Sequence, residues 1–292
     1  MTGRETVVGV LGGSGVYGMD GLEDTEWRRV ESPFGSPSDD LLFGRLHGVR
    51  MVFLPRHGRG HRISPTEINY RANIDALKRA GCTDVISVSA CGSFREELAP
   101  GSFVIVDQFI DRTFAREKSF FGSGLVAHVS MADPVCSRLG DALEQAATEC
   151  GIDHARGGTY LAMEGPQFST RAESFLYRDW GCSVIGMTNM PEAKLAREAE
   201  LCYATVAMVT DYDCWREGDA HVDVEAVLTI LHGNADKAQN LISAVVPKLA
   251  GHRPACNVGC DRALEVALIT PPEAREEAMV NRLDAVAGRV LS

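Results

Sequence analysis

The sequence lacks the features that would direct a chain to a membrane or out of the cell. No run of apolar residues approaches the roughly 18–20 residues of a membrane-spanning helix. Residues 1–5 lack the apolar core of a signal peptide. The nine cysteines are an odd number in a chain of 292 residues, which favours a reducing compartment. We therefore expect a cytoplasmic protein without a membrane partner.

The sequence also lacks an excess of positive charge. It has 29 Lys and Arg against 40 Asp and Glu, which gives a net charge of −11. A chain of this charge repels polyanions, so we expect no nucleic-acid partner. A local basic site for a small anion is compatible with this composition. The hydrophobic fraction of 45% is ordinary for a soluble globular protein.

Two nucleotide motifs and a metal motif are missing as well. The glycine-rich turn at residues 12–15 has neither the G-x-G-x-x-G spacing of a dinucleotide site nor the G-K-[ST] of a P-loop. Cys256 and Cys260 have C-x3-C spacing, but no further cysteine or histidine follows at a zinc-like spacing. We therefore predict no metal and free thiols at these cysteines, with a local disulfide as the alternative.

Strand and helix patterns alternate along the chain, which predicts an α/β fold: one mixed, mostly parallel β-sheet flanked by helices. Strands are expected at residues 7–11, 50–55, 84–89, 103–107, 159–163, 184–187 and 206–209. Helices are expected at residues 68–80 after a capping box at 64–67, and at 134–150, 170–180, 191–199, 224–242 and from 271 onward. We expect a single domain over residues 1–292, with a core at about 7–250 and a helical tail at about 260–292.

The most informative stretch is residues 210–215, which follow an apolar strand. On extended backbone the side chains of Asp211 and Asp213 face the same way. Buried carboxylates cost free energy unless a ligand uses them. Adenine could use both, because N7 accepts a proton from Asp211 and the 6-amino group donates to ionised Asp213. The alternative is a solvated turn with acids that cap a helix.

A second group of polar residues also follows strand ends, where ligands bind in α/β sheets. The Gly-Gly-Ser-Gly turn offers backbone N–H groups and the hydroxyl of Ser14 to an anion. Arg56 and His57 could clamp a phosphate, and Ser89 and Thr188 would add neutral donors. Donors of modest charge bind phosphate and leave it nucleophilic. Taken singly, each of these motifs is also compatible with a structural turn.

As a set, these motifs resemble the family of trimeric purine nucleoside phosphorylases and methylthioadenosine phosphorylases. The matching segments are residues 12–15, 32–35, 56–58 with His61, 69–73, 89–93, 107–112, 164–169 and 210–215, in family order. The resemblance implies a homotrimer that converts S-methyl-5'-thioadenosine and phosphate into adenine and 5-methylthioribose 1-phosphate. It also implies that no cofactor is needed beyond phosphate, which is a co-substrate.

The family's residue roles carry over to matching positions. The resemblance assigns phosphate binding to Ser14, Arg56, His57, Ser89, Ala90 and Thr188, and catalysis at the purine to Asp211 and Asp213. It assigns substrate contacts to Phe168, Ser169, Met187, Val224, Val227 and Leu228, and to His128 of a neighbouring subunit. Residues near Leu268 would also reach the next subunit. The spacing of the last three apolar residues fits an ordinary helix core equally well.

Two other functions remain open. The chain could be a 6-oxopurine nucleoside or methylthioinosine phosphorylase, although a carboxylate at Asp213 accepts hydrogen bonds and cannot donate one to a 6-oxo group. It could also bind nucleotides without turnover. For catalysis the pKa of Asp211 should be raised by burial and by the like charge of Asp213.

Overall fold

Across the residues that the structure, a computed structural model, describes (5–13, 15–216, 224–251 and 255–291), eleven strands form one mixed sheet. The strands are β1 (Val7–Gly12), β2 (Glu23–Arg28), β3 (Leu41–Leu46), β4 (Val49–Pro55), β5 (Asp84–Ser93), β6 (Phe103–Ile105), β7 (Gln108–Asp111), β8 (His154–Arg156), β9 (Thr159–Ala162), β10 (Val184–Gly186) and β11 (Cys202–Asp211). The predicted mixed α/β fold is confirmed.

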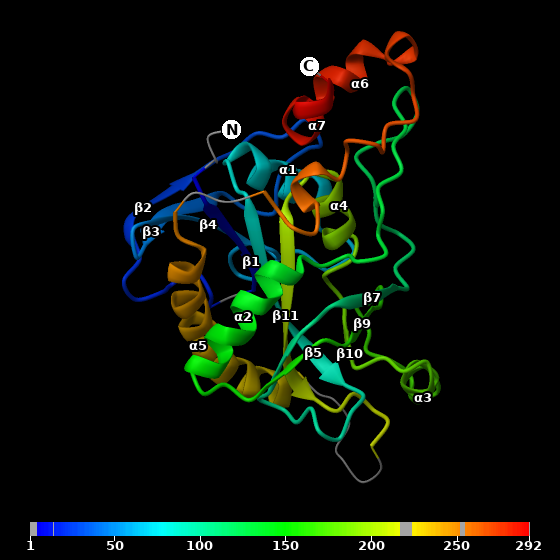
Figure 1. Ribbon diagram of the computed structural model, residues 1–292. Helices are drawn as coiled ribbons and strands as arrows, with labels where there is room; N and C mark the ends of the chain where they lie inside the picture. Colours follow the sequence, from blue (N-terminus) through cyan, green and yellow to red (C-terminus); the bar gives the residue numbers. More distant parts are fainter. Residues whose placement is uncertain (1–4, 14, 217–223, 252–254, 292) are drawn as a thin grey trace.

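The strand order is β2-β3-β4-β1-β5-β10-β9-β7, with β11 paired to β5 and β6, and β8 paired to β6. β4, β1, β5 and β11 run parallel, whereas β10 is antiparallel to β5 and β6 is antiparallel to β11. In Figure 1 the arrowheads of β5 and β11 point to the same end of the molecule. Polar residues that follow these strands therefore meet at one edge.

Helices cover both faces of the sheet (Figure 1). They are α1 (Tyr70–Arg79), α2 (Ser137–Glu149), α3 (Arg171–Asp179), α4 (Glu192–Glu198), α5 (Val224–Leu249), α6 (Glu277–Arg282) and α7 (Asp284–Leu291). α2 and α5 pack together and against β11, while α4 packs on β11 and on α1, and α1 contacts α7. None of the described helices is both long and apolar enough to cross a membrane.

The two faces of the sheet bury two separate cores. Along β11, Tyr203, Ala207 and Val209 pack into the core under α1 and α4. Their neighbours Ala204 and Val206 pack into the core under α2 and α5. Strands buried on both faces read as continuous apolar runs, and this explains why β11 stands out in the sequence.

The element boundaries show where local signals fail. Thr170 and Glu173 form the capping box expected for α3. At the expected start of α1, Ser64 does bond Glu67 at 2.7 Å, but this bond closes a turn. The helix begins at Tyr70, because Asn69 caps it by accepting from the backbone of Ala72. The prediction of a helix from residue 68 is therefore two residues early.

Candidate active site

Asp211 is the last residue of β11, and a β-bulge precedes it. On β5 the partners of Val209 and Asp211 are the consecutive residues Cys91 and Gly92, so Thr210 is an extra residue on β11. A bulge of this kind locally changes the direction of the side chains. The direction of Asp211 therefore does not follow from the alternation of the residues before it.

Asp213 lies beyond the strand, in a turn. Its φ of 51° is in the left-handed region, which an aspartate tolerates better than most residues. Its backbone N–H donates to Oδ1 of Asp211 at 2.8 Å. The expectation that extended backbone aligns the two side chains is wrong, because a turn places Asp213.

Both aspartates nevertheless pack against the same residue of β5. A Cβ atom at Gly92 would lie 2.9 Å from Oδ1 of Asp211 and 3.3 Å from Cβ of Asp213. Burial is the largest cause that raises the pKa of each carboxyl, and the charge of Asp213 adds to the increase at Asp211. The expected direction at Asp211 is confirmed. A raised pKa lets this carboxyl hold a proton that it can donate.

Arg56, directly after β4, is 1% exposed and bound mainly by the protein itself. Its guanidinium bonds both carboxylate oxygens of Glu192, at 2.7 and 3.1 Å, and the hydroxyl of Ser87 at 2.6 Å. It also donates to the carbonyls of Leu11 and Val88. Among the residues that the structure describes, Nη1 bonds only the carbonyl of Val88, so one of its two hydrogens is left for a ligand. Glu192 and Ser87 escaped the sequence analysis.

Asn189 connects this buried ion pair to two predicted phosphate ligands. Its Oδ1 accepts from the hydroxyls of Ser89 at 2.9 Å and Thr188 at 3.0 Å. Its Nδ2 donates to Ser87 at 3.3 Å and to the hydroxyl of Tyr203 at 3.1 Å. Asn189 is fully buried, so the bonds fix the positions of Ser89 and Thr188. The structure thus brings the two hydroxyls together, from β5 and from the loop after β10.

His57 is neutral in this environment. Burial and then the charge of Arg56 lower the pKa of His57 to about 4. Nδ1 bonds the carbonyl of Ile63 at 2.9 Å, and because a carbonyl only accepts, Nδ1 carries the hydrogen. The ring also stacks on His61, with centroids 4.3 Å apart. Nε2 therefore has a lone pair and can accept a hydrogen bond from a ligand.

Tyr160 of β9 holds a hydroxyl that the sequence analysis did not anticipate. Its side chain is fully buried, and among the described residues its hydroxyl has no hydrogen-bond partner. A Cβ atom at Gly186 would overlap the hydroxyl oxygen, so the glycine makes room for it. Burial raises the pKa of Tyr160 to about 12, while the nearby hydroxyls of Thr188 and Ser89 oppose this increase. An unpaired polar atom beside these hydroxyls points to a ligand there.

Several predicted residues flank the acidic turn. The carbonyl of Ser169 accepts from Sγ of Cys214 at 3.4 Å, and the hydroxyl of Ser169 lowers the otherwise raised pKa of Asp213. Phe168 is 47% exposed. Met187 packs so closely on Gly165 that a Cβ there would lie 2.5 Å from its Sδ.

Other predictions cannot be placed in this way. Ser14 lies outside the described residues. Val224, Val227 and Leu228 belong to α5, but their side chains lie outside the part of the chain that the structure describes. Ala90 is a half-buried residue of β5, next to Ser89. The assignments of these residues stay predictions.

His128 lies on an exposed segment and is tied to the C-terminal tail. Its N–H donates to the carbonyl of Ala267 at 2.9 Å, and Ala127 pairs with Leu268 in an antiparallel bridge. The resemblance assigns His128, and a residue near Leu268, to the pocket of a neighbouring subunit. The structure joins them in one ribbon, which we call the 125–128/267–270 ribbon.

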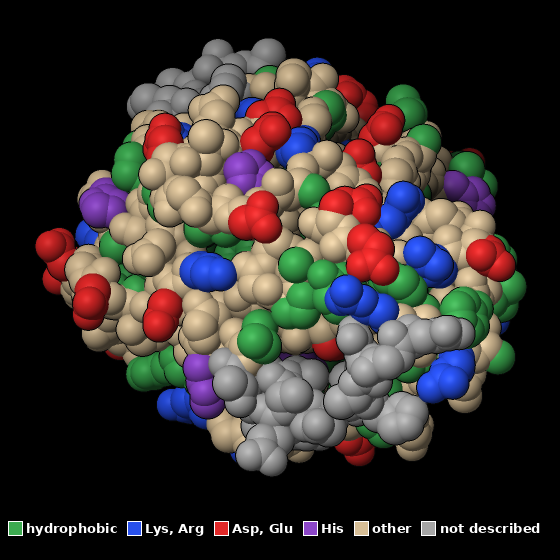
Figure 2. All heavy atoms as spheres, turned by 90° about the horizontal axis from the view of Figure 1, so that it is seen from below, with side chains coloured by type: hydrophobic (Ala, Val, Ile, Leu, Met, Phe, Trp, Pro, Cys, Tyr) green, Lys and Arg blue, Asp and Glu red, His purple; other side chains and the backbone are tan. Residues whose placement is uncertain are grey.

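The surface around the site has no uniform charge. Figure 2 views the end of the molecule toward which β5 and β11 run, and acidic, basic and apolar side chains are mixed across it.

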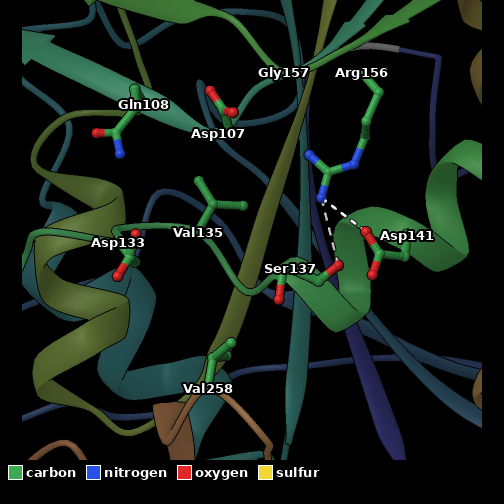
Figure 3. Close-up of a pocket in the computed structure, with 9 residues that line it drawn as sticks. All are labelled: Asp107, Gln108, Asp133, Val135, Ser137, Asp141, Arg156, Gly157 and Val258. Carbon is green, nitrogen blue, oxygen red and sulfur yellow. Dashed lines mark hydrogen bonds and ion pairs between the residues drawn. The ribbon is translucent and has the colours of Figure 1, made fainter.

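A hollow of about 420 Å³ lies elsewhere (Figure 3). It is lined by Asp107, Gln108, Asp133, Val135, Ser137, Asp141, Arg156, Gly157 and Val258. Arg156 crosses it toward α2 and bonds Asp141 at 3.0 Å. This lining includes neither member of the acidic pair, so the hollow is not the candidate active site.

Comparisons with known proteins agree with this geometry. The model of the phosphorylase superfamily matches residues 7–247. S-methyl-5'-thioadenosine phosphorylases from Cereibacter sphaeroides and Rhodospirillum rubrum are 64% and 63% identical to the chain, over 98% and 99% of its length and 99% and 98% of theirs. The crystal structure of a methylthioadenosine phosphorylase from an Antarctic soil metagenomic library matches with a TM-score of 0.91 and 46% identity, over 97% of this chain and 99% of that one. A mutant adenosine/methylthioadenosine phosphorylase from Schistosoma mansoni in complex with adenine matches with a TM-score of 0.85 and 38% identity, over 91% and 99%.

Proposed function

The chain belongs to the phosphorylase superfamily, and on this premise we propose that it catalyses the phosphorolysis of S-methyl-5'-thioadenosine. The products are adenine and 5-methylthioribose 1-phosphate, so the enzyme is a pentosyltransferase that acts on a nucleoside and phosphate. Relatives of that name, identical at more than 60% of positions over nearly the full length, support this substrate.

One observation supports the placement of the reaction most strongly. Ser89 and Gly92 lie three residues apart on β5. Ser89 is one of the two hydroxyl residues that bond Asn189, and Gly92 is the residue on which both aspartates pack. At the rise of a strand this separation is about 10 Å. With phosphate bound near Ser89 and the purine near Gly92, the anomeric carbon lies between them. Phosphorolysis requires this arrangement.

The acidic pair acts on the purine. As an oxygen of phosphate forms its bond to the anomeric carbon, the bond from that carbon to N9 breaks and its electron pair leaves with the base. Asp211, whose raised pKa favours the protonated form, gives its proton to N7 and neutralises the leaving purine. Asp213 accepts from the 6-amino group and so selects adenine. The sugar passes through an oxocarbenium-like state, which the bound phosphate stabilises.

The phosphate ligands carry little net charge. When phosphate binds, Ser89 and Thr188 turn their hydroxyl hydrogens from Oδ1 of Asn189 to the phosphate oxygens, because each hydroxyl has only one hydrogen to donate. Arg56 supplies its remaining Nη1 hydrogen, and neutral His57 accepts from a protonated phosphate oxygen through Nε2. Ser14 and Ala90 add the donors that the family resemblance assigns to them. Most of the positive charge of Arg56 is already balanced by Glu192, so the phosphate stays nucleophilic.

The remaining assignments complete the pocket. Phe168, Ser169 and Met187 contact the base and the sugar, and Val224, Val227 and Leu228 line the methylthio end. His128 comes from a neighbouring subunit of a homotrimer. The reaction itself uses no metal and no organic cofactor, and the enzyme works in the cytoplasm as one domain with a helical tail.

The test of this function is phosphate-dependent release of adenine. The enzyme should release adenine from S-methyl-5'-thioadenosine with phosphate present, and 5-methylthioribose 1-phosphate should form in equal amount. Equal cleavage in phosphate-free buffer, with free methylthioribose as the product, would indicate a hydrolase. Faster turnover of methylthioinosine or inosine would indicate a 6-oxopurine enzyme.

A further inference from the structure

Four buried cysteines converge at one point, away from the candidate active site. They are Cys136 before α2, Cys202 at the start of β11, and Cys256 and Cys260 in the C-terminal segment. Their sulfur atoms all lie within 4.8 Å of one another, and each residue is at most 1% exposed. Cys136 and Cys202 are far in sequence from the C-x3-C pair, so the spacing of the pair does not reveal them, and the fold supplies these two further thiols.

The spacing of the sulfurs fits a shared metal ion better than a disulfide. Sγ of Cys136 and Sγ of Cys256 are 3.8 Å apart, whereas a disulfide bond is about 2.0 Å long. In a tetrahedral zinc site with zinc–sulfur bonds of about 2.3 Å, the edge between two sulfurs is about 3.8 Å.

Cationic side chains face the sulfurs. Nη1 of Arg197 lies 3.6 Å from Sγ of Cys260, in a buried contact. The guanidinium of Arg138 also lies beside the thiol of Cys202, and it forms an ion pair with the buried carboxylate of Asp84. A neutral thiol is a weak acceptor that does little for a buried cation, whereas a metal-bound thiolate is an anion that these guanidinium groups would stabilise.

The C-x3-C turn presents its two sulfurs on one side. The N–H of Gly259 donates to the carbonyl of Cys256 at 3.0 Å, and Gly259 has a φ of 74°. The carboxylate of Asp261 accepts from the N–H of Cys256 at 2.9 Å. The turn is therefore held in shape by its own backbone and by the side chain of Asp261, as the first two ligands of a metal site need to be.

We propose that Cys136, Cys202, Cys256 and Cys260 bind one Zn²⁺ ion in a tetrahedral, purely structural site. The four thiols release their four protons to solvent when the ion binds, which leaves a net charge of minus two on the centre. Arg197 and Arg138 offset part of this charge, although Arg138 is also paired with Asp84. Because all four positions are filled by protein, no position is open for substrate and the ion takes no part in the phosphorolysis.

The hollow in Figure 3 is lined by chain neighbours of the proposed ligands. Val135 and Ser137, on either side of Cys136, line it, and so does Val258, which lies between the two cysteines of the turn. The bound ion would join the start of α2, the start of β11 and the C-terminal segment. It would thereby anchor the segment that leads to the 125–128/267–270 ribbon.

The metal content of the intact protein tests the proposal. Protein purified with a thiol reductant and without chelator should contain about one zinc per chain, measured by plasma mass spectrometry. After the zinc is removed and replaced by Co²⁺, the protein should show the visible and thiolate charge-transfer bands of tetrahedral cobalt. A protein without zinc that also gives no such cobalt spectrum, or peptide mass spectra with disulfides among these four cysteines, would overturn the proposal.

Variants locate the site. Cys256→Ser combined with Cys260→Ser should lose the zinc and lower the Tm. Cys82→Ser combined with Cys182→Ser changes two equally buried cysteines outside the cluster and should keep one zinc per chain. If the first variant does not fold, the cobalt spectrum of the unaltered chain decides the question. Zinc retained by a folded first variant would refute the assignment.

Discussion

Arg56 and Glu192 form an ion pair at 2.7 Å in which each side chain is only 1% exposed. The pair lies beneath the candidate phosphate site and connects to it through Ser87 and Asn189. Most hydrogen bonds of Arg56 therefore hold the protein itself together. Within the described part of the chain, only the second hydrogen of its Nη1 is available to a ligand.

We expect Arg56→Met to destabilise the protein strongly, because it leaves the carboxylate of Glu192 buried without its partner. Removal of one member of a buried pair costs about 3–5 kcal/mol. Arg28→Met, which breaks an exposed pair with Glu26, should cost less than about 1 kcal/mol. Urea unfolding of both variants measures the difference. Equal midpoints would show that the Arg56–Glu192 pair is not important for stability.

Phosphate affinity should depend on the two hydroxyls that Asn189 holds. Ser89→Ala and Thr188→Val should each raise the KM for phosphate roughly 10-fold or more, since a hydrogen bond to a charged group contributes about 1.5–3 kcal/mol. Ser93→Ala is the matched control, because Ser93 is buried on the same strand but bonds the carbonyl of Arg95. Initial rates at varied phosphate measure the effect. A similar KM in all three variants would remove the hydroxyls from the site.

Tyr160→Phe should weaken phosphate binding with no loss of stability. The hydroxyl makes no bond within the described protein, so its removal relieves an unpaired buried group, while a bound ligand would lose a donor. Tyr203→Phe provides the contrast, because the hydroxyl of Tyr203 donates to Glu192 at 2.9 Å and its loss should cost about 1 kcal/mol. Thermal unfolding and the KM for phosphate are measured on both. A Tyr160→Phe protein that is less stable but has an unchanged KM would contradict a ligand contact.

Base specificity should follow the polarity of Asp213. A site built on one polar contact rejects the mismatched analogue by on the order of 10⁴-fold, so the unaltered enzyme should scarcely cleave methylthioinosine. Asp213→Asn can donate to a 6-oxo group and should raise kcat/KM for methylthioinosine relative to methylthioadenosine. Asp211→Ala should lower turnover of both, because it removes the donor to N7. A preference of the unaltered enzyme for methylthioinosine would exclude this role of Asp213.

The proposed trimer should depend on apolar side chains near the tail. Val266 is 93% exposed and Ile269 is 61% exposed in the single chain, close to the 125–128/267–270 ribbon. Exposed apolar groups of this kind mark interaction surfaces. Ile269→Asp should shift the protein to smaller species in sedimentation velocity and lower its activity. Thr148→Asp, which adds the same charge to α2, should leave a trimer. An active monomer of the unaltered chain would refute the shared pocket.

The sequence was sufficient to predict those parts of the fold that depend on burial. β1 is buried along its whole length and β11 along all but its last residue, and both read as apolar runs. β2 (Glu23–Arg28) does not read as an apolar run, because its residues are mostly exposed and polar. Only its pairing with β3 makes it a strand. Its position at the sheet edge is a property of the fold and leaves no periodic signal.

Sequence patterns likewise reveal only some residues of the site. Asp211, Arg56 and Ser89 could be singled out because polar side chains at the ends of buried strands are conspicuous. Tyr160 lies within an apolar strand and reads as core, although its hydroxyl lies beside Ser89 and Thr188. Cys136 and Cys202 are also ordinary core residues by pattern, and only the folded chain shows that they meet Cys256 and Cys260.

Because Thr210 is an extra residue on β11, the direction of the Asp211 carboxyl depends on the number of residues in that strand. Deletion of one residue there would restore the regular alternation and turn the carboxyl of Asp211 toward another face, although every side chain of the pocket would still be present. The position of the Asp211 carboxyl is therefore sensitive to insertions and deletions in β11. Relatives that share the acidic pair are expected to share the number of residues between Val209 and Asp213 as well.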